Sequence, residues 1–246
     1  MGDVVCVVAK TCAVTNVAII LAAGVGRRMA AAVPKQYLPL GQGMVIDHTL
    51  DAFLFHPDIA ELTVVAAKDD VAHMQAVVAA HKPHKPTTVV AGGDERWQSA
   101  AAGVERYAHC GDVNVLLHDA ARPLVSAQTI SDVVAALALH EAVSVAIPTK
   151  DTIYAVEGQV VSSIPNRATL WQAQTPQAFR APLIAAAYQW FATQPQRNAT
   201  DDCGVLLAYK PDAKISVVVG APENMKITTP TDLLLTECLT SKPNHI

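Results

Sequence analysis

The stretch that decides the fold is residues 17–29, Val-Ala-Ile-Ile-Leu-Ala-Ala-Gly-Val-Gly-Arg-Arg-Met. It begins with Val17–Leu21, an aliphatic run of the length of a buried strand. A glycine-rich turn with Arg27 and Arg28 follows directly, and Lys35 comes a few residues later. Backbone N–H groups in such a turn can approach phosphate oxygens closely, and the cations supply positive charge. The stretch therefore predicts a strand that ends at a site for a phosphate-bearing ligand.

This turn matches neither of the common phosphate-binding motifs. It is not a Walker A loop, because no Gly-Lys-Ser/Thr closes it, and Met29 occupies the third glycine position of a dinucleotide fingerprint. A tight turn without a ligand is the alternative interpretation. Three cations so close together favour the ligand, since a merely structural turn has no need of them.

The alternation of strand and helix continues through the chain. Short β-branched runs predict further strands at Leu62–Ala66, Thr87–Val90, Val113–Leu117, Val143–Ile147 and Ile215–Val219. Longer stretches between them predict helices at Val45–His56, Asp70–His81, Glu95–Ala108, Gln128–His140, Pro182–Thr193 and Pro230–Leu239. This order is typical of the α/β class, with a mostly parallel sheet covered on both faces. No repeat or linker divides the chain, so we expect one domain with its ligands at the carboxyl ends of the strands.

Residues 152–167 break this alternation. The segment reads as a strand at Ile153–Val156, the turn Glu157-Gly158-Gln159, and a second strand at Val160–Ile164. This spacing predicts a β-hairpin. A two-stranded ribbon is marginal in water unless something covers it. Either it folds back on its own core or it pairs with a second subunit, and the pattern leaves both open.

Composition and charge exclude several classes of partner. The 246 residues are 51% hydrophobic and carry a formal net charge of −4, so the chain is not disordered and lacks the positive field that nucleic acid or an anionic membrane requires. No apolar run reaches the roughly 18 residues of a membrane span. Residues 1–16 are apolar, but Lys10 lies inside that part and no basic residue precedes it, unlike a signal peptide. We interpret residues 1–16 as an N-terminal extension and expect a cytoplasmic protein.

Two loops after predicted strands carry candidate ligand-binding residues. In His118-Asp119-Ala120-Ala121-Arg122-Pro123, the Asp119 carboxylate suits Mg²⁺, which prefers one or two carboxylates together with substrate phosphates and water. Alternatively, Asp119 caps the following helix or pairs with Arg122. In Ala91-Gly92-Gly93-Asp94-Glu95-Arg96, with Ser99 one turn on, backbone groups and a hydroxyl could read a base edge. The alternative there is a glycine loop before a helix that Asp94 caps.

Lys226 is the last candidate cation. It lies among apolar neighbours in Asn224-Met225-Lys226-Ile227-Thr228, which indicates an anionic partner. The sequence shows no G-x-S-x-G or H-E-x-x-H motif and no nucleophile beside a base, so covalent catalysis is disfavoured.

A series of motifs runs in order along the chain: Leu21-Ala22-Ala23-Gly24-x-Gly26-x-Arg28-Met29, Pro34-Lys35-Gln36-Tyr37, Gly92-Gly93-Asp94-Glu95-Arg96, His118-Asp119-Ala120-Ala121-Arg122-Pro123, Thr175-Pro176-Gln177-x-Phe179, Thr200-Asp201-Asp202 and Asn224-x-Lys226-Ile227-Thr228. Together they resemble the 2-C-methyl-D-erythritol 4-phosphate cytidylyltransferase family. The resemblance implies a Rossmann-like single domain over residues 17–242 with a protruding β-arm at 150–167. It also implies a homodimer in which this arm reaches the partner's active site.

The resemblance implies a reaction and a role for each candidate residue. CTP and 2-C-methyl-D-erythritol 4-phosphate would give the cytidine diphospho-alcohol and pyrophosphate in isoprenoid precursor biosynthesis, with Mg²⁺ as cofactor. The implied catalytic residues are Arg28, Lys35 and Lys226. The implied nucleotide-binding residues are Ala22, Ala23, Gly24, Gly93, Asp94, Ser99, Asp119 and Ala120, with Asp119 also at the metal. The implied acceptor-binding residues are Arg122, Thr152 and Arg167.

Two other functions stay open at this point. Ribitol-5-phosphate cytidylyltransferases share most of these motifs and differ chiefly around the acceptor pocket. A non-catalytic nucleotide-binding protein of the same fold would bind CTP without releasing pyrophosphate, although it would have no reason to keep like charges crowded together. For the enzyme we expect in-line attack of the acceptor phosphate on the α-phosphorus, with positioned cations neutralising the transition state.

Overall fold

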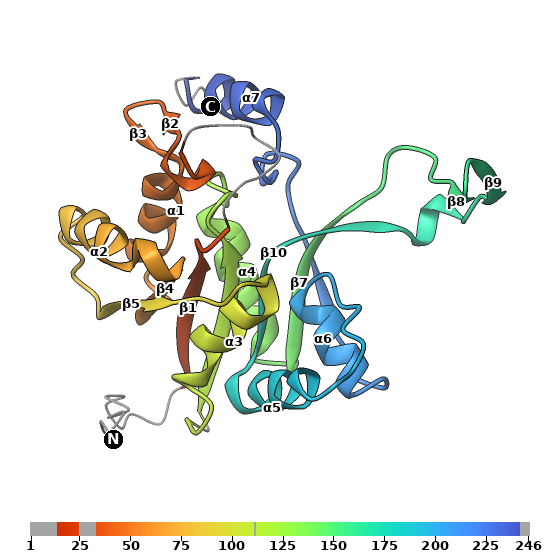
Figure 1. The fold of residues 1–246 in the computed structure, drawn as a ribbon, viewed down its shortest axis with the longest axis horizontal. Helices are drawn as coiled ribbons and strands as arrows, with labels where there is room; N and C mark the ends of the chain where they lie inside the picture. Colours follow the sequence, from red (N-terminus) through yellow and green to blue (C-terminus); the bar gives the residue numbers. More distant parts are fainter. Residues whose placement is uncertain (1–13, 25–32, 111, 242–246) are drawn as a thin grey trace.

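The computed structural model describes residues 14–24, 33–110 and 112–241. At its centre lies a seven-stranded sheet with the order β11-β7-β10-β6-β1-β4-β5 (Figure 1). Its strands are β1 (Thr15–Leu21), β4 (Glu61–Ala66), β5 (Thr87–Ala91), β6 (Val113–Asp119), β7 (Ala142–Pro148), β10 (Trp171–Arg180) and β11 (Ser216–Val219). Every strand predicted for this sheet is among them, and all its pairings except those of β10 are parallel. The predicted α/β fold is confirmed, and β1 begins inside the expected N-terminal extension.

The sequence does not predict β10, which pairs antiparallel with both β6 and β7. Pro176 interrupts this run, and proline has no N–H to donate, so it is normally excluded from central strands. Here the pairing with β7 shifts register between Ala173 and Gln177. The proline therefore falls where the ladder is already irregular. The strand brings Thr175 against β6, where its hydroxyl accepts a hydrogen bond of 3.2 Å from the Asp119 backbone N–H.

Helices cover both faces of the sheet. One face packs against α1 (Val45–Leu54), α2 (Val71–Ala80) and α4 (Ala127–Leu137), and the other against α3 (Arg96–Glu105), α5 (Ala181–Ala192) and α6 (Asp202–Tyr209). Strand β1 is apolar over Val17–Leu21 because both of its faces are buried. Ala18 and Ile20 join the hydrophobic core on the first face, and Val17 and Ile19 join the core on the second. The parallel strands therefore end at one edge with both faces closed, which leaves that edge for a ligand.

The remaining elements lie at the ends of the sheet. Helix α7 (Pro230–Thr240) packs near the short strands β2 (Pro39–Leu40) and β3 (Gly43–Met44). Thr229 caps α7 in a capping box, and the Ser126 side chain caps α4. Helix α6 is not predicted, since its eight residues include Gly204 in the first turn. None of the helices in the described part of the chain is long and apolar enough to cross a membrane.

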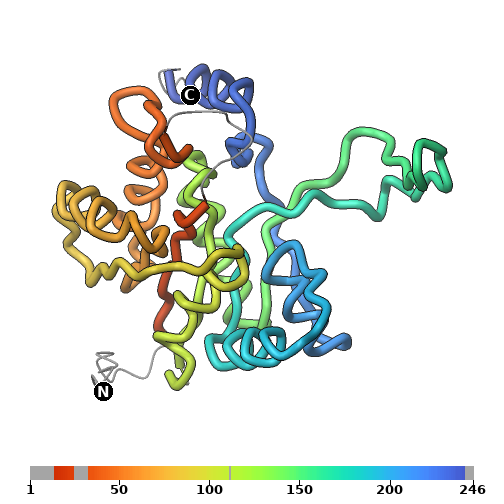
Figure 2. The backbone as a smooth tube through the Cα atoms, in the orientation of Figure 1, coloured from red at the N-terminus to blue at the C-terminus, as the bar shows by residue number. Residues whose placement is uncertain are grey.

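The predicted hairpin forms and stands away from the sheet as an arm (Figures 1 and 2). Its strands are β8 (Ala155–Glu157) and β9 (Val160–Ser163), joined by a turn in which Gly158 has a φ of 62°. Apolar side chains along the arm are exposed, among them Tyr154 at 56% and Val160 at 71%. The alternative that the hairpin folds back on its own core is therefore wrong.

Candidate active site

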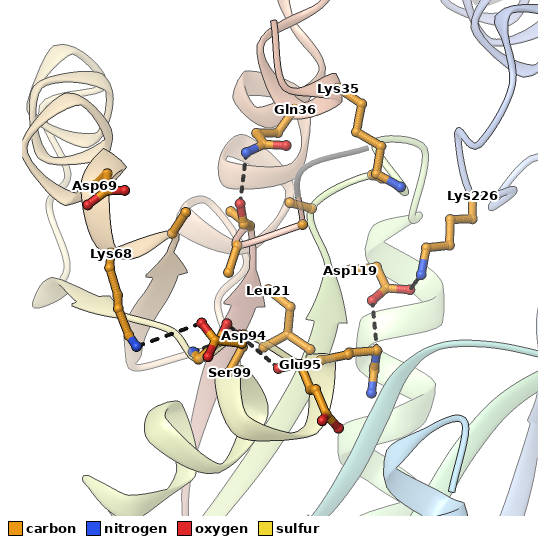
Figure 3. Close-up of a pocket in the computed structure, with 18 residues that line it drawn as sticks. Leu21, Lys35, Gln36, Lys68, Asp69, Asp94, Glu95, Ser99, Asp119 and Lys226 are labelled. Carbon is orange, nitrogen blue, oxygen red and sulfur yellow. Dashed lines mark hydrogen bonds and ion pairs between the residues drawn. The ribbon is translucent and has the colours of Figure 1, made fainter. Parts of the chain in front are cut away.

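A cavity of about 750 Å³ opens at the carboxyl edge of the parallel strands. Its walls come from the segments that follow β1, β4, β5 and β6, together with η2 (Lys35–Tyr37) and Lys226 (Figure 3). Most of the residues proposed from sequence line it: Ala22, Ala23, Gly24, Lys35, Gly93, Asp94, Ser99, Asp119, Ala120 and Lys226. Arg28 lies outside the described residues.

Hydrogen bonds to β4 and η2 fix the position of the segment after β1. The Ala22 N–H donates to the Val65 carbonyl at 2.8 Å, and the Gln36 side-chain amide donates to the Ala22 carbonyl at 2.8 Å. Gln36 is 3% exposed, so this bond forms out of water. The Pro-Lys-Gln-Tyr motif therefore positions the first loop through Gln36, a role that the sequence does not reveal.

Gly92 and Gly93, after β5, lie too close to side chains of α3 for any residue with a Cβ to fit. A Cβ on Gly92 would lie 2.6 Å from Ser99 Oγ, and one on Gly93 would lie 2.3 Å from the Gln98 Cβ. The Gly93 N–H donates to Ser99 Oγ at 3.2 Å, which fixes the loop against the first turn of α3. Any side chain at either glycine would push this wall of the cavity out of place.

Asp94 does not cap α3, so that alternative is wrong. The N-cap is Glu95, whose backbone N–H donates to Gln98 Oε1 at 2.9 Å as part of a capping box. The Asp94 carboxylate instead lies at the cavity rim, 89% exposed and 3.8 Å from Lys68 Nζ. Lys68 and Asp94 mark one end of the cavity, and Ser99 lies beside them (Figure 3).

At the other end, Asp119 is surrounded by cations. Its Oδ2 lies 2.8 Å from Lys226 Nζ and 3.6 Å from Arg122 Nε, and its Oδ1 lies 3.5 Å from Arg96 Nε. Burial alone raises the pKa of the Asp119 carboxyl, but Arg96, Lys226 and Arg122 outweigh burial and hold this pKa well below its usual range. The group is therefore a fixed negative charge among three positive ones. The expected pairing of Asp119 with Arg122 is present, at longer range than the pair with Lys226.

Lys35 and Lys226 enter the cavity from different parts of the chain and lie near the same end (Figure 3). Lys35 Nζ donates to the Ile227 carbonyl at 3.1 Å. The Ile227 N–H in turn donates at 2.8 Å to the carbonyl of Ala121, two residues after Asp119 in the chain. Three separate motifs thus converge on one cationic patch, and the predicted anionic partner of Lys226 is Asp119.

Arg122 and His118 hold in place the loop that carries Asp119. The Arg122 guanidinium is mostly buried and donates to the Asn224 carbonyl at 2.7 Å and the Ala173 carbonyl at 3.4 Å. His118 is fully buried, and burial lowers its pKa to about 4, so the ring is neutral near pH 7. Its Nε2 therefore donates to the Arg122 carbonyl at 3.1 Å, and its Nδ1 accepts from the Thr175 hydroxyl at 3.0 Å. His118 orders the loop that carries Asp119 and is not poised as a base.

Thr152 and Arg167 are not brought to this cavity by their own chain. Both are exposed, and Arg167 Nη1 donates to the Lys150 carbonyl at 2.8 Å at the base of the arm. Arg122 also lies outside the cavity lining. Thr152 and Arg167 are thus separated from the residues expected to bind the nucleotide, whereas Arg122 contacts one of those residues, Asp119.

Arg96 lines the cavity although sequence reasoning gives it no role. It is quoted in the Gly-Gly-Asp-Glu-Arg motif, but its partner, Asp202, lies 106 residues away. The sequence does not show a contact between residues that far apart. The position of Arg96 at the start of a predicted helix, just after a strand and a glycine loop, is the signal that could have placed it in the site.

A mostly parallel sheet whose carboxyl edge carries a glycine loop, an ionised aspartate and converging lysines defines an α/β protein that binds a nucleotide through its phosphates. The family model described as "IspD: 2-C-methyl-D-erythritol 4-phosphate cytidylyltransferase" matches residues 16–242. The chain belongs to this family.

Individual proteins similar to this chain include members of this family and one protein with a different name. A 2-C-methyl-D-erythritol 4-phosphate cytidylyltransferase from Thermobifida fusca is 38% identical over 228 residues, covering 90% of this chain and 92% of the relative. A crystal structure of the 4-diphosphocytidyl-2C-methyl-D-erythritol synthase from Anaerococcus prevotii superposes with a TM-score of 0.81 at 31% identity, over 93% of this chain and 96% of that one. A bifunctional ribulose 5-phosphate reductase/CDP-ribitol pyrophosphorylase from Haemophilus influenzae is 34% identical over 94% of this chain but only 49% of its own length.

Proposed function

We propose that this enzyme transfers the cytidylyl group of CTP to 2-C-methyl-D-erythritol 4-phosphate and releases pyrophosphate, a step of isoprenoid precursor biosynthesis. The observation that carries the proposal is the convergence of Lys35, Lys226 and Asp119 beside the glycine loops, within a family match that spans residues 16–242. Two anionic reactants must meet there, and fixed cations lower the cost of bringing them together.

The cavity suggests which end holds which part of the nucleotide. The rim with Gly93, Asp94 and Ser99 offers small residues and backbone groups, which suits the cytosine. The end with Lys35 and Lys226 suits the triphosphate and the charge that develops at the α-phosphorus. Ala22, Ala23 and Gly24 lie between them, and Asp119 with Ala120 is assigned to the ribose side. The acceptor phosphate is already ionised near pH 7, so no general base is needed.

The donor set fits Mg²⁺ that arrives with the nucleotide. Among the described residues, no cluster of three His, Cys, Asp or Glu side chains could hold a metal ion by itself. Asp119 Oδ1 is 3.5 Å from Arg96 Nε, beyond a normal hydrogen bond, so this oxygen can face a hydrated cation shared with phosphate oxygens. When bound, Mg²⁺ would neutralise part of the triphosphate charge.

We assign the arm to a homodimer. The exposed apolar side chains of β8 and β9 need a cover, since a lone two-stranded ribbon is marginal in water. A second copy would supply it, and its arm would bring Thr152 and Arg167 toward the end of the cavity where Arg122 of this chain lies against Asp119. The net charge of −4 supports the absence of nucleic-acid and membrane partners.

The substrates are tested by measuring pyrophosphate release with each of CTP, UTP, GTP and ATP against 2-C-methyl-D-erythritol 4-phosphate and ribitol 5-phosphate. We expect activity with CTP and methylerythritol phosphate. The similarity to the CDP-ribitol pyrophosphorylase makes ribitol 5-phosphate the second candidate acceptor. Release with ribitol phosphate alone would reassign the acceptor, activity only with another nucleotide would overturn the proposal, and CTP binding without any release would indicate a non-catalytic protein.

Substitution of Arg167 tests the shared site. In Arg167→Ala we expect the KM for the acceptor to rise by on the order of 10-fold or more with a smaller change in kcat, because an exposed arginine on the arm binds the acceptor phosphate and not the reacting phosphorus. Steady-state kinetics at saturating CTP measure both.

The same variant also tests whether the arm acts across subunits. Arg167→Ala and Lys35→Ala chains are unfolded together, refolded and assayed at low acceptor concentration. If each site combines two chains, mixed dimers regain one intact site, and about a quarter of all sites become active. A mixture no more active than the average of its components would place both residues in one chain's site.

A further inference from the structure

Arg96, which lines the cavity, forms an ion pair with a fully buried carboxylate behind it. The two terminal nitrogens of Arg96 donate to Asp202, Nη1 to Oδ1 at 2.7 Å and Nη2 to Oδ2 at 2.9 Å. Asp202, the first residue of α6, is 0% exposed and does not line the cavity. It also accepts a hydrogen bond from the Tyr188 hydroxyl on α5, and its backbone N–H donates to Gln177 Oε1 at 3.0 Å. Both carboxylate oxygens and the backbone N–H of Asp202 are therefore hydrogen-bonded.

This pair determines where the rest of the Arg96 guanidinium lies. A bidentate arginine and carboxylate share one plane, so the two bonds to Asp202 fix the orientation of the whole fork. The remaining nitrogen, Nε, then faces Asp119 Oδ1 at 3.5 Å. Arg96 thus bridges a carboxylate inside the site and one outside it, and the position of the bridge is set by α6.

Asp202 also balances the charge of the site. Asp119 faces the three cations Arg96, Arg122 and Lys226, of which Arg96 is shared with Asp202. Asp202 neutralises Arg96, and of the three ion pairs of Asp119 the one with Lys226, at 2.8 Å, is the shortest. A fully buried carboxylate has a large desolvation cost, and well-packed apolar residues often stabilise a fold as well as a buried ion pair does. Stability alone therefore does not account for Asp202.

We propose that Asp202, supported by Tyr188, is a positioning residue of the nucleotide site: it holds Arg96 beside Asp119, and so fixes the carboxylate against which Lys226 is placed. The proposal rests on the proposed function, because the cavity is taken to bind CTP. Asp202 itself touches neither substrate. Its effect should reach CTP binding and turnover through Arg96 and Asp119. The effect on the acceptor should be smaller, because only Arg122 among the residues expected to bind the acceptor contacts Asp119.

The first test is the kinetics of Asp202→Asn, which keeps the shape of the side chain and removes its charge. We expect kcat/KM for CTP to fall by on the order of 10-fold or more, with the KM for the acceptor within about 2-fold of the wild type. Tyr188→Phe, which removes one hydrogen bond to Asp202, should give a smaller loss in the same direction. Unchanged CTP parameters in a folded Asp202→Asn variant would overturn the proposal.

The matched control is Asp201→Asn. Asp201 is the neighbouring carboxylate and caps α6, its Oδ1 accepting from the Gly204 N–H at 2.8 Å, while Oδ2 accepts from the Gln177 amide at 2.7 Å. The variant disturbs the same end of α6 without removing a partner of Arg96. We expect it to lower the thermal midpoint and leave CTP kinetics near wild type. If both variants impair CTP turnover in proportion to their loss of stability, Asp202 is merely structural.

A double-mutant cycle shows whether Asp202 acts through Asp119. CTP affinity is measured by calorimetry for Asp202→Asn, Asp119→Asn and the double variant. If the pathway runs through Asp119, Asp202→Asn changes affinity by less than about 2-fold once Asp119 is already neutral. Full multiplication of the two effects would overturn the proposal. A wild-type chain that neither binds CTP nor releases pyrophosphate would overturn the proposed function itself, whereas an active wild type with an indifferent Asp202→Asn overturns only this inference.

Discussion

Lys35→Ala is expected to lower kcat by on the order of 10²-fold or more. Lys35 lines the cavity at the end where Lys226 and Asp119 meet, and its Nζ is held 3.1 Å from the Ile227 carbonyl. A lysine held there is already oriented when negative charge builds on the α-phosphorus, so it stabilises the transition state more than the bound substrate. The loss should therefore appear in kcat and not only in the KM for CTP.

Lys35 also joins two segments, which adds to the effect. Its bond to the Ile227 carbonyl ties η2 to the residue next to Lys226. Alanine removes both the charge and this tie, and a displacement of about 1 Å at a reacting centre can cost on the order of 10²-fold. Lys35→Arg keeps the charge on a longer, planar group and should recover only part of the rate.

Steady-state and single-turnover pyrophosphate release separate chemistry from product release in these variants. The matched control is Lys210→Ala, which removes a lysine of α6's carboxyl end that lies 3.8 Å from Glu141 at the surface. An exposed pair of that kind contributes little, so the control should behave as wild type. A Lys35→Ala enzyme with unchanged kcat would remove Lys35 from the catalytic set.

The arrangement of the site could be predicted largely because its parts follow strand ends. The Gly92-Gly93 loop and Asp119 each come directly after a predicted strand, and the carboxyl ends of parallel strands meet at one edge. Periodicity and local turn chemistry suffice to locate such residues. The catalytic role of Lys226 could not be assigned in this way, because Lys226 lies in an irregular segment. That role came from the resemblance to a family.

What the sequence could not show depends on contacts between distant segments. Strand β10 reads as a loop because Pro176 interrupts it, and its place between β6 and β7 is determined by packing. Asp94 looks as good a cap as Glu95, and the reciprocal bond to Gln98 decides between them only in three dimensions. The ion pair of Arg96 with Asp202 joins α3 to α6, and the sequence around either residue does not indicate the other as its partner.

Asp119→Asn should have the largest effect on stability of the substitutions considered. The side chain is 10% exposed, and its charge compensates Lys226, Arg96 and Arg122. Asparagine fits the same space but leaves these cations without that partner, and breaking a buried pair in this way costs about 3 kcal/mol. We expect the free energy of unfolding to fall by roughly this amount, measured by urea denaturation near pH 7.

Activity should fall as well, for a reason separate from stability. Lys226 lies 2.8 Å from Asp119 Oδ2, so the neutral amide no longer holds the ammonium in place. We expect kcat/KM for CTP to drop by on the order of 10²-fold when assayed well below the unfolding transition. Circular dichroism of the assayed sample confirms that the loss belongs to folded enzyme.

The pH dependence of stability distinguishes a lost charge from lost packing. In the folded wild type the pKa of Asp119 is well below the value near 3.9 of an unfolded chain, so the ionised group contributes its full stability above about pH 4. That contribution is lost as pH falls from there through the folded pKa. The wild type and Asp119→Asn should therefore differ by a constant amount between about pH 5 and pH 8, and their stabilities should converge below about pH 4. A difference that persists unchanged in acid would mean that Asp119 stabilises the fold by shape and hydrogen bonding, and the three cations would then not depend on its charge.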